Sequence, residues 1–77
     1  MISYQIADIN DAEKLVSLCR QFAEDIDVIY QRYTIDAKSL LGVTAMVGNI
    51  VSLEIITKDD DIKRRFSETV NSLKEGR

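Results

Sequence analysis

The chain has 77 residues, of which 45% are hydrophobic, and ten Lys and Arg against thirteen Asp and Glu give a formal net charge of -3. This length suits a single domain, 1–77, close to the lower size at which a hydrophobic core alone holds a fold. The mildly acidic charge disfavours non-specific nucleic-acid binding, which needs concentrated positive charge, and we expect no nucleic-acid partner.

The first residues predict a strand followed by a helix. Apolar and polar residues alternate over 2–6, which is typical of a strand with one covered face. The next apolar residues fall three and four apart, as on one face of a helix: Ala12, Leu15, Val16, Cys19, Phe22 and Ala23. Asn10, with Glu13 three residues later, has the capping-box spacing, and Asp8 is a second candidate for the cap.

Two more alternating segments, 26–31 and 33–37, predict a second and a third strand. Only a few residues around Gln31 and Arg32 separate them, so we expect an antiparallel hairpin, although its turn lacks the usual glycine.

Ser39 stands where an N-cap is expected for a short helix from Leu40 to Val47, which Gly48 would end. Gly42 inside this helix costs roughly 1 kcal/mol relative to alanine, so some contact must favour glycine there. A fourth strand is predicted over 51–55. The final helix begins at the aspartates 59–61 and has an apolar face formed by Ile62, Phe66, Thr69, Val70 and Leu73.

The element order βαββαβα predicts an α+β fold in two layers, a four-stranded antiparallel sheet covered on one face by helices. Two architectures have this order: an open-faced sandwich, and a ferredoxin-like fold with an added helix. In the ferredoxin-like sheet, the first strand lies between the third and the second.

Residues 38–43, Lys-Ser-Leu-Leu-Gly-Val, are similar to the Lys-Ser-Ile-Met-Gly-Val segment of the HPr family, the bacterial histidine-containing phosphocarriers of the phosphotransferase system. Residues 25–28, Asp-Ile-Asp-Val, support the resemblance at the start of the second strand. The resemblance implies a single HPr-like domain, an open-faced sandwich whose first strand pairs with the fourth and whose fourth pairs with the second.

The position equivalent to the family's phosphohistidine is Asn10, and Ala12 stands where the family has an arginine. The chain has no histidine at all, and an amide nitrogen is no phosphoryl nucleophile because its lone pair is delocalised into the carbonyl. Asp8, Asp11 and Glu13 would repel an incoming phosphate. We therefore expect no enzyme activity and no histidine phosphoryl carriage, and an aspartate or serine acceptor is the alternative.

In the family, the serine that matches Ser39 is a target of a regulatory kinase, which makes Ser39 a candidate phosphosite beside its plain role as a cap. The resemblance also implies a partner-binding face formed by Ala12, Leu40, Leu41 and Thr44, so we expect a regulatory, partner-binding domain with phosphotransferase-system or other regulatory proteins as partners. The alternative is a ferredoxin-like module that binds a ligand or dimerises.

The sequence contains no His/Cys metal set, and we expect no metal and no cofactor. Cys19, the one cysteine, cannot form an internal disulfide and falls on the apolar helix face, where we expect it to be buried. No apolar run reaches the roughly 18 residues of a membrane span and no signal-peptide pattern opens the chain. We expect a cytoplasmic protein with no membrane partner.

Overall fold

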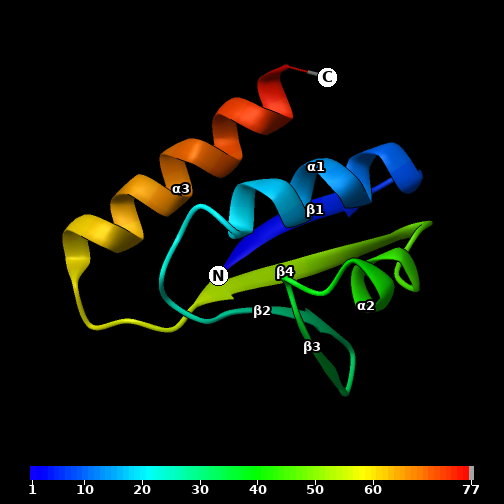
Figure 1. Cartoon of the computed structure of the whole chain (residues 1–77), viewed down its shortest axis with the longest axis horizontal. Helices are drawn as coiled ribbons and strands as arrows, with labels where there is room; N and C mark the ends of the chain where they lie inside the picture. Colours follow the sequence, from blue (N-terminus) through cyan, green and yellow to red (C-terminus); the bar gives the residue numbers. More distant parts are fainter. Residues whose placement is uncertain (77) are drawn as a thin grey trace.

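The computed structural model describes residues 1–76, and the element order is the predicted βαββαβα (Figure 1). The elements are β1 (Ile2–Ile6), α1 (Ile9–Cys19), β2 (Ile26–Tyr30), β3 (Tyr33–Asp36), α2 (Leu40–Thr44), β4 (Asn49–Ile55) and α3 (Asp60–Glu75). Two helices are shorter than predicted. The apolar stripe of α1 runs on to Phe22, which is buried after the helix has ended, whereas Ala23 is exposed.

The four strands form one antiparallel sheet in the order β1-β4-β2-β3. Neighbouring strands pair residue by residue: Tyr4 of β1 lies opposite Val51 of β4, and Val28 of β2 lies opposite Leu53 of β4. This is the order expected of an HPr-like sheet. The ferredoxin-like alternative is wrong, because β1 lies at an edge beside β4 rather than between β3 and β2.

The hairpin between β2 and β3 is confirmed, with Tyr30 opposite Tyr33 and only Gln31 and Arg32 in the loop. Gln31 has a φ of 54°, the left-handed region that the first residue of a type II′ turn requires. Glycine is usual at this position, so the turn forms here on a residue that sequence rules do not favour.

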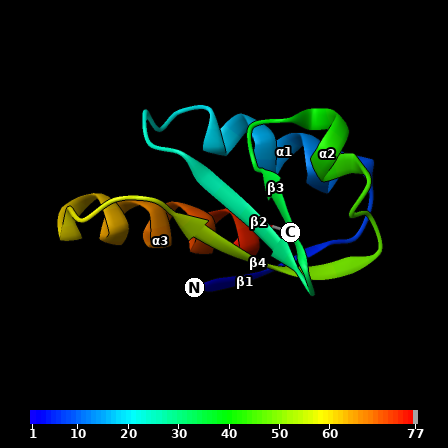
Figure 2. The ribbon, with the colours of Figure 1, turned by 90° about the horizontal axis from the view of Figure 1, so that it is seen from below.

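The three helices cover one face of the sheet, and the core lies between the two layers (Figure 2). The inward residues of the central strand β4, Val51, Leu53 and Ile55, are all at least 92% buried. From the helices come Leu15 of α1, Val43 of α2 and Phe66 of α3, and the ring of Phe66 packs edge-on against Phe22 at 5.4 Å. Period-two strands and 3.6-residue helices therefore point their apolar residues into one shared core.

The other face of the sheet is open, and its residues are mostly polar because alternate side chains of each strand point there. Ile50 is 63% exposed on this face. Three carboxylates lie on it in one cross-strand row, since Asp27 pairs with Asp36 on one side and with Glu54 on the other.

Candidate functional site

Asp8 caps α1. It has an extended backbone, and its Oδ1 accepts a hydrogen bond from the Asp11 amide at 2.8 Å. Asp11 reciprocates, because its Oδ2 accepts from the Ala7 amide at 2.9 Å. The donors at this helix end, which would bind an anion in a phosphoryl site, are thus partly occupied by the chain's own carboxylates.

Asn10 is the second residue of α1 and does not cap it, so of the two candidate caps Asp8 is the one used. The Asn10 side chain is exposed and lies over the shallow groove between α1 and α3, which is also lined by Glu13 and Ser17 of α1 and by Leu73 of α3. Asn10, which the family resemblance matches with the phosphohistidine, therefore lies in the opening turn of α1, on the side that faces α3.

The prediction that Ala12 belongs to a partner-binding face is wrong. Its side chain is fully buried in the core under α1. An arginine at this position would have to leave the core to reach the start of α1.

Ser39 caps α2 as predicted, and its Oγ accepts a hydrogen bond from the Gly42 amide at 3.3 Å. Within α2, Val43 is fully buried, whereas Leu40 and Leu41 are 41% and 86% exposed. The Thr44 hydroxyl donates to the Leu40 carbonyl at 2.6 Å, so it is already satisfied within the helix.

Hydrogen bonds lie near both ends of α2 and fix its direction relative to α1. At one end, Nε and Nη2 of Arg20 donate to the Lys38 carbonyl at 3.2 and 3.0 Å. At the other end, the Gly48 amide donates to the Ile6 carbonyl at 2.7 Å, just before α1 begins. The two helices therefore lie side by side and run in opposite directions (Figures 1 and 2).

Sequence reasoning missed Ile9, the first residue of α1, which is 57% exposed. It precedes Ala12 by three and Val16 by seven, so it continues the buried stripe beyond the edge of the core. This helical spacing is the feature of the sequence from which the place of Ile9 on α1 could have been predicted. Ile9, Leu40, Leu41 and Thr44 are hereafter called the α1/α2 face.

Cys19 is fully buried, as expected. Burial raises the pKa of its thiol to about 12; the nearby Lys38 opposes this effect and Asp36 adds to it. The thiol is therefore neutral at physiological pH and acts as a small apolar group.

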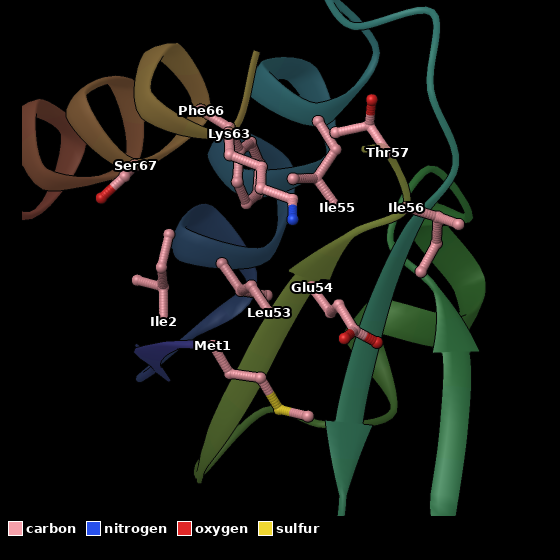
Figure 3. A pocket seen from close by; sticks show the side chains of 10 residues that line it. All are labelled: Met1, Ile2, Leu53, Glu54, Ile55, Ile56, Thr57, Lys63, Phe66 and Ser67. Atoms are coloured by element: carbon pink, nitrogen blue, oxygen red, sulfur yellow. The ribbon is translucent and has the colours of Figure 1, made fainter. Parts of the chain in front are cut away.

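A hollow of about 390 Å³ lies between the start of β1, the end of β4 and the first turns of α3 (Figure 3). Its floor is apolar, with Leu53 and Phe66, and Lys63 and Glu54 are the charged residues that line it. It sits at the end of the molecule opposite α2 (Figure 1), so it takes no part in the α1/α2 face.

Among residues 1–76, no group of three or more His, Cys, Asp or Glu side chains could hold a metal ion, so Asp8, Asp11 and Glu13 do not form such a site. No helix within the same residues is long and apolar enough to cross a membrane.

No protein-family model and no curated protein matches this chain. Among solved structures, it is similar to the crystal structure of HPr-C-His from Thermoanaerobacter tengcongensis, with a TM-score of 0.67 and 19% sequence identity over 92% of this chain and 90% of that chain. At this identity the likeness establishes the fold. The chain has an HPr-like, open-faced α+β sandwich.

Proposed function

We propose that this chain is a non-catalytic, HPr-like regulatory domain that binds a protein partner through the α1/α2 face. The partner is a protein of the phosphotransferase system or one of its regulators. The observation that carries the proposal is Leu41, which is 86% exposed near the start of α2.

The α1 end supports binding without phosphoryl transfer. Asn10 offers no nucleophile, and the carboxylates of Asp8 and Asp11 lie where phosphoryl oxygens would have to approach the helix. Two like charges about 6 Å apart repel by about 3 kcal/mol at an effective dielectric of 20. A phosphoryl group at this helix end would therefore meet repulsion from both carboxylates.

The α1/α2 face has the character of a small docking surface. Full burial of an exposed leucine or isoleucine side chain contributes about 1.5–3 kcal/mol. Ile9, Leu40 and Leu41 are 57%, 41% and 86% exposed, so the apolar gain on binding would come mainly from Leu41. The Thr44 hydroxyl keeps its bond to the Leu40 carbonyl and adds little desolvation cost.

Ser39 is the place where such binding would be regulated. Its Oγ is half-buried at the start of α2, next to Leu40. A phosphate there adds a charge of about -1.5 to -2 beside the apolar side chains, which would oppose an apolar partner surface.

Two measurements test the proposal. Incubation with labelled phosphoenolpyruvate and enzyme I from the same organism should leave the chain unlabelled, and stoichiometric acid-labile labelling would contradict it. Titration of the ¹⁵N-labelled chain with enzyme I or with a phosphotransferase-system regulator should shift the amides of 9 and 40–44.

The control compares two exposed apolar residues on different faces. Leu41→Glu should abolish these shifts, whereas Ile50→Glu, on the open sheet face, should leave them unchanged. Shifts that survive in Leu41→Glu, or that map to the open face, would reject the α1/α2 face as the binding surface.

A further inference from the structure

Residues 38–47, hereafter called the α2 segment, place a single side chain in the core. Val43 is fully buried, and the other residues of the segment are half-buried or exposed. α1, which is of similar length, has five buried residues. A helix of five residues has little stability of its own in water, because its few hydrogen bonds do not offset the entropy lost in nucleation. The position of the α2 segment therefore depends on its contacts with neighbouring elements.

The chain is fixed to the sheet on either side of the α2 segment. Before it, Ala37 is fully buried and its amide donates to the Ile26 carbonyl at 2.9 Å. After it, the Gly48 amide donates to the Ile6 carbonyl at 2.7 Å. Gly48 has a φ of 95°, which glycine adopts at no steric cost. The two ends of the segment are thus anchored, and the ten residues between them are placed to move together.

Crossed hydrogen bonds join the start of the α2 segment to the end of α1. Nε and Nη2 of Arg20 donate to the Lys38 carbonyl at 3.2 and 3.0 Å. In the opposite direction, Nζ of Lys38 donates to the Phe22 carbonyl at 2.6 Å. Each side therefore supplies a charged donor and a backbone acceptor, and such charge-assisted bonds are stronger than neutral ones. These bonds of Arg20 and Lys38 are hereafter called the clasp.

Phe22 is held in place independently of the α2 segment. Its ring packs edge-on against Phe66 at 5.4 Å, and the Arg65 guanidinium lies 4.9 Å from the ring centroid. Phe66 and Arg65 both belong to α3, which lies away from α2 (Figures 1 and 2). Release of the α2 segment would break the clasp and withdraw Val43 from the core, but it would leave the contacts between Phe22 and α3 intact.

We propose that the α2 segment opens and closes as one unit while the rest of the chain stays folded, and that the clasp holds it closed. Segments with few buried contacts open at lower free energy than the global unfolding of a protein. In the open state Leu40, Leu41 and Thr44 leave their positions relative to α1, so the α1/α2 face exists only when the segment is closed. If the proposed function holds, a partner's apparent affinity scales with the closed fraction, but the opening itself does not depend on that function.

Native-state hydrogen exchange of the unaltered chain tests the local opening. The amides of Val43 and Ala45, which donate within the α2 segment, should be at least tenfold less protected than those of β4. Their exchange should change little at low urea, because local opening exposes little surface, whereas exchange in β4 should rise steeply. Equal protection with the same urea dependence would overturn the proposal, since the α2 segment would then open only when the whole chain unfolds.

Two variants separate local opening from a general loss of stability. Lys38→Met keeps an apolar side chain and removes the donor to the Phe22 carbonyl, so exchange at Val43 and Ala45 should become at least threefold faster. Val70→Ala weakens the core under α3, so it should speed exchange in β4 and leave Val43 and Ala45 unchanged. Acceleration of the α2 segment and of β4 by the same factor in Val70→Ala, or no response to Lys38→Met, would refute the proposal. The urea dependence of the unaltered chain decides between local and global opening without any variant.

The contribution of Arg20 to the clasp has a matched control. Arg20→Gln should speed exchange at Val43 and Ala45 at least twofold, because the side chain no longer reaches the Lys38 carbonyl with two donors. Arg64→Gln removes the same charge from exposed ion pairs on α3 and should leave this exchange unchanged. Equal responses to the two arginine variants would reject the clasp as the contact that holds the segment closed.

The outcomes for the opening and for the proposed function are separable. Local opening in the absence of any amide shift with enzyme I or a regulator retains the opening and rejects the proposed function. Amide shifts with a partner, in a chain whose α2 segment exchanges only through global unfolding, retain the function and reject the opening.

Discussion

At Gly42, a β-carbon built on the backbone would lie 2.6 Å from Cγ2 of Ile35, which is closer than packed carbon atoms approach. This contact is what favours glycine inside α2 in spite of its helix propensity. Gly42→Ala should lower the free energy of unfolding by about 1–3 kcal/mol, because overpacking outweighs the roughly 1 kcal/mol that alanine gains in a helix.

Chemical denaturation measures this effect, and a double-mutant cycle with Ile35→Ala isolates its cause. The loss should shrink when Ile35 is already truncated. Gly76→Ala is the control, since the nearest atoms to its added β-carbon lie at 3.6 Å. Additive effects of Gly42→Ala and Ile35→Ala would contradict the steric explanation.

The buried Cys19 thiol makes stability depend on pH above neutrality. Burial raises its pKa from the ordinary value of 9.0 to about 12, so between these values the folded chain keeps the proton that the unfolded chain loses. The thiol's contribution is fully present below pH 9.0 and is lost as the pH rises towards about 12. Within that window the slope is about -1.4 kcal/mol per pH unit.

The measurement compares urea unfolding of the unaltered chain and of Cys19→Ala from pH 8 to pH 11. Lysine and tyrosine titrations are common to both proteins, so the difference in slope belongs to Cys19. Parallel pH profiles, or labelling of the native thiol by iodoacetamide at pH 8, would contradict this account.

At the scale of elements, the start of α1 depends on one side chain. Asp8→Ala removes the acceptor of the Asp11 amide and should cost about 1 kcal/mol of unfolding free energy. Asn10→Ala, two residues later and inside the helix, should change it by less than about 0.5 kcal/mol. Thermal unfolding of the two variants decides between them, and a larger loss for Asn10→Ala would show that Asn10 is the cap after all.

The open face of the sheet carries an unfavourable row of charges. Asp27 has Asp36 and Glu54 as its direct cross-strand neighbours, and like charges in such positions destabilise a sheet. Asp27→Asn, which removes the charge with little change of shape, should raise the free energy of unfolding by about 0.5–1 kcal/mol. This gain in stability should fall in 1 M salt, which screens the charges. The control Glu13→Gln, at an exposed helix position, should give no gain. A gain from Asp27→Asn that persists in high salt would exclude charge repulsion as its cause.

These strands were predictable because alternation over 2–6, 26–30 and 51–55 directly reflects one covered and one open face of the sheet. The cap of α1 was not, because Asp8 and Asn10 both have capping side chains. Which of the two residues caps the helix depends on where the chain leaves β1, whose last residue, Ile6, accepts a hydrogen bond from the Gly48 amide. For Ala12 the apolar spacing pointed to the core and the family resemblance to a surface, and the structure agrees with the spacing.

At the scale of the whole molecule, an HPr-like sandwich is present with carboxylates, and no histidine, at the start of α1. The strands in this order share one apolar core, to which the exposed residues 8–10 at the start of α1 do not belong. Fold and site chemistry are therefore separable, since the sandwich forms here with carboxylates that accept hydrogen bonds from the amides near the start of α1.

A single substitution should therefore not restore phosphoryl carriage. In Asn10→His the imidazole would lie at the second position of α1, on the side that faces α3. The Asp8 carboxylate would still accept from the Asp11 amide, and the Asp11 carboxylate from the Ala7 amide. Their charges would repel a phosphoryl group, and the buried Ala12 leaves no room for a neutralising arginine. Incubation with labelled phosphoenolpyruvate and enzyme I should leave Asn10→His unlabelled, with a histidine-containing HPr as the positive control. Stoichiometric phosphohistidine at position 10 would show that this helix end still binds phosphate, and that the loss of the histidine alone separates the chain from a working carrier.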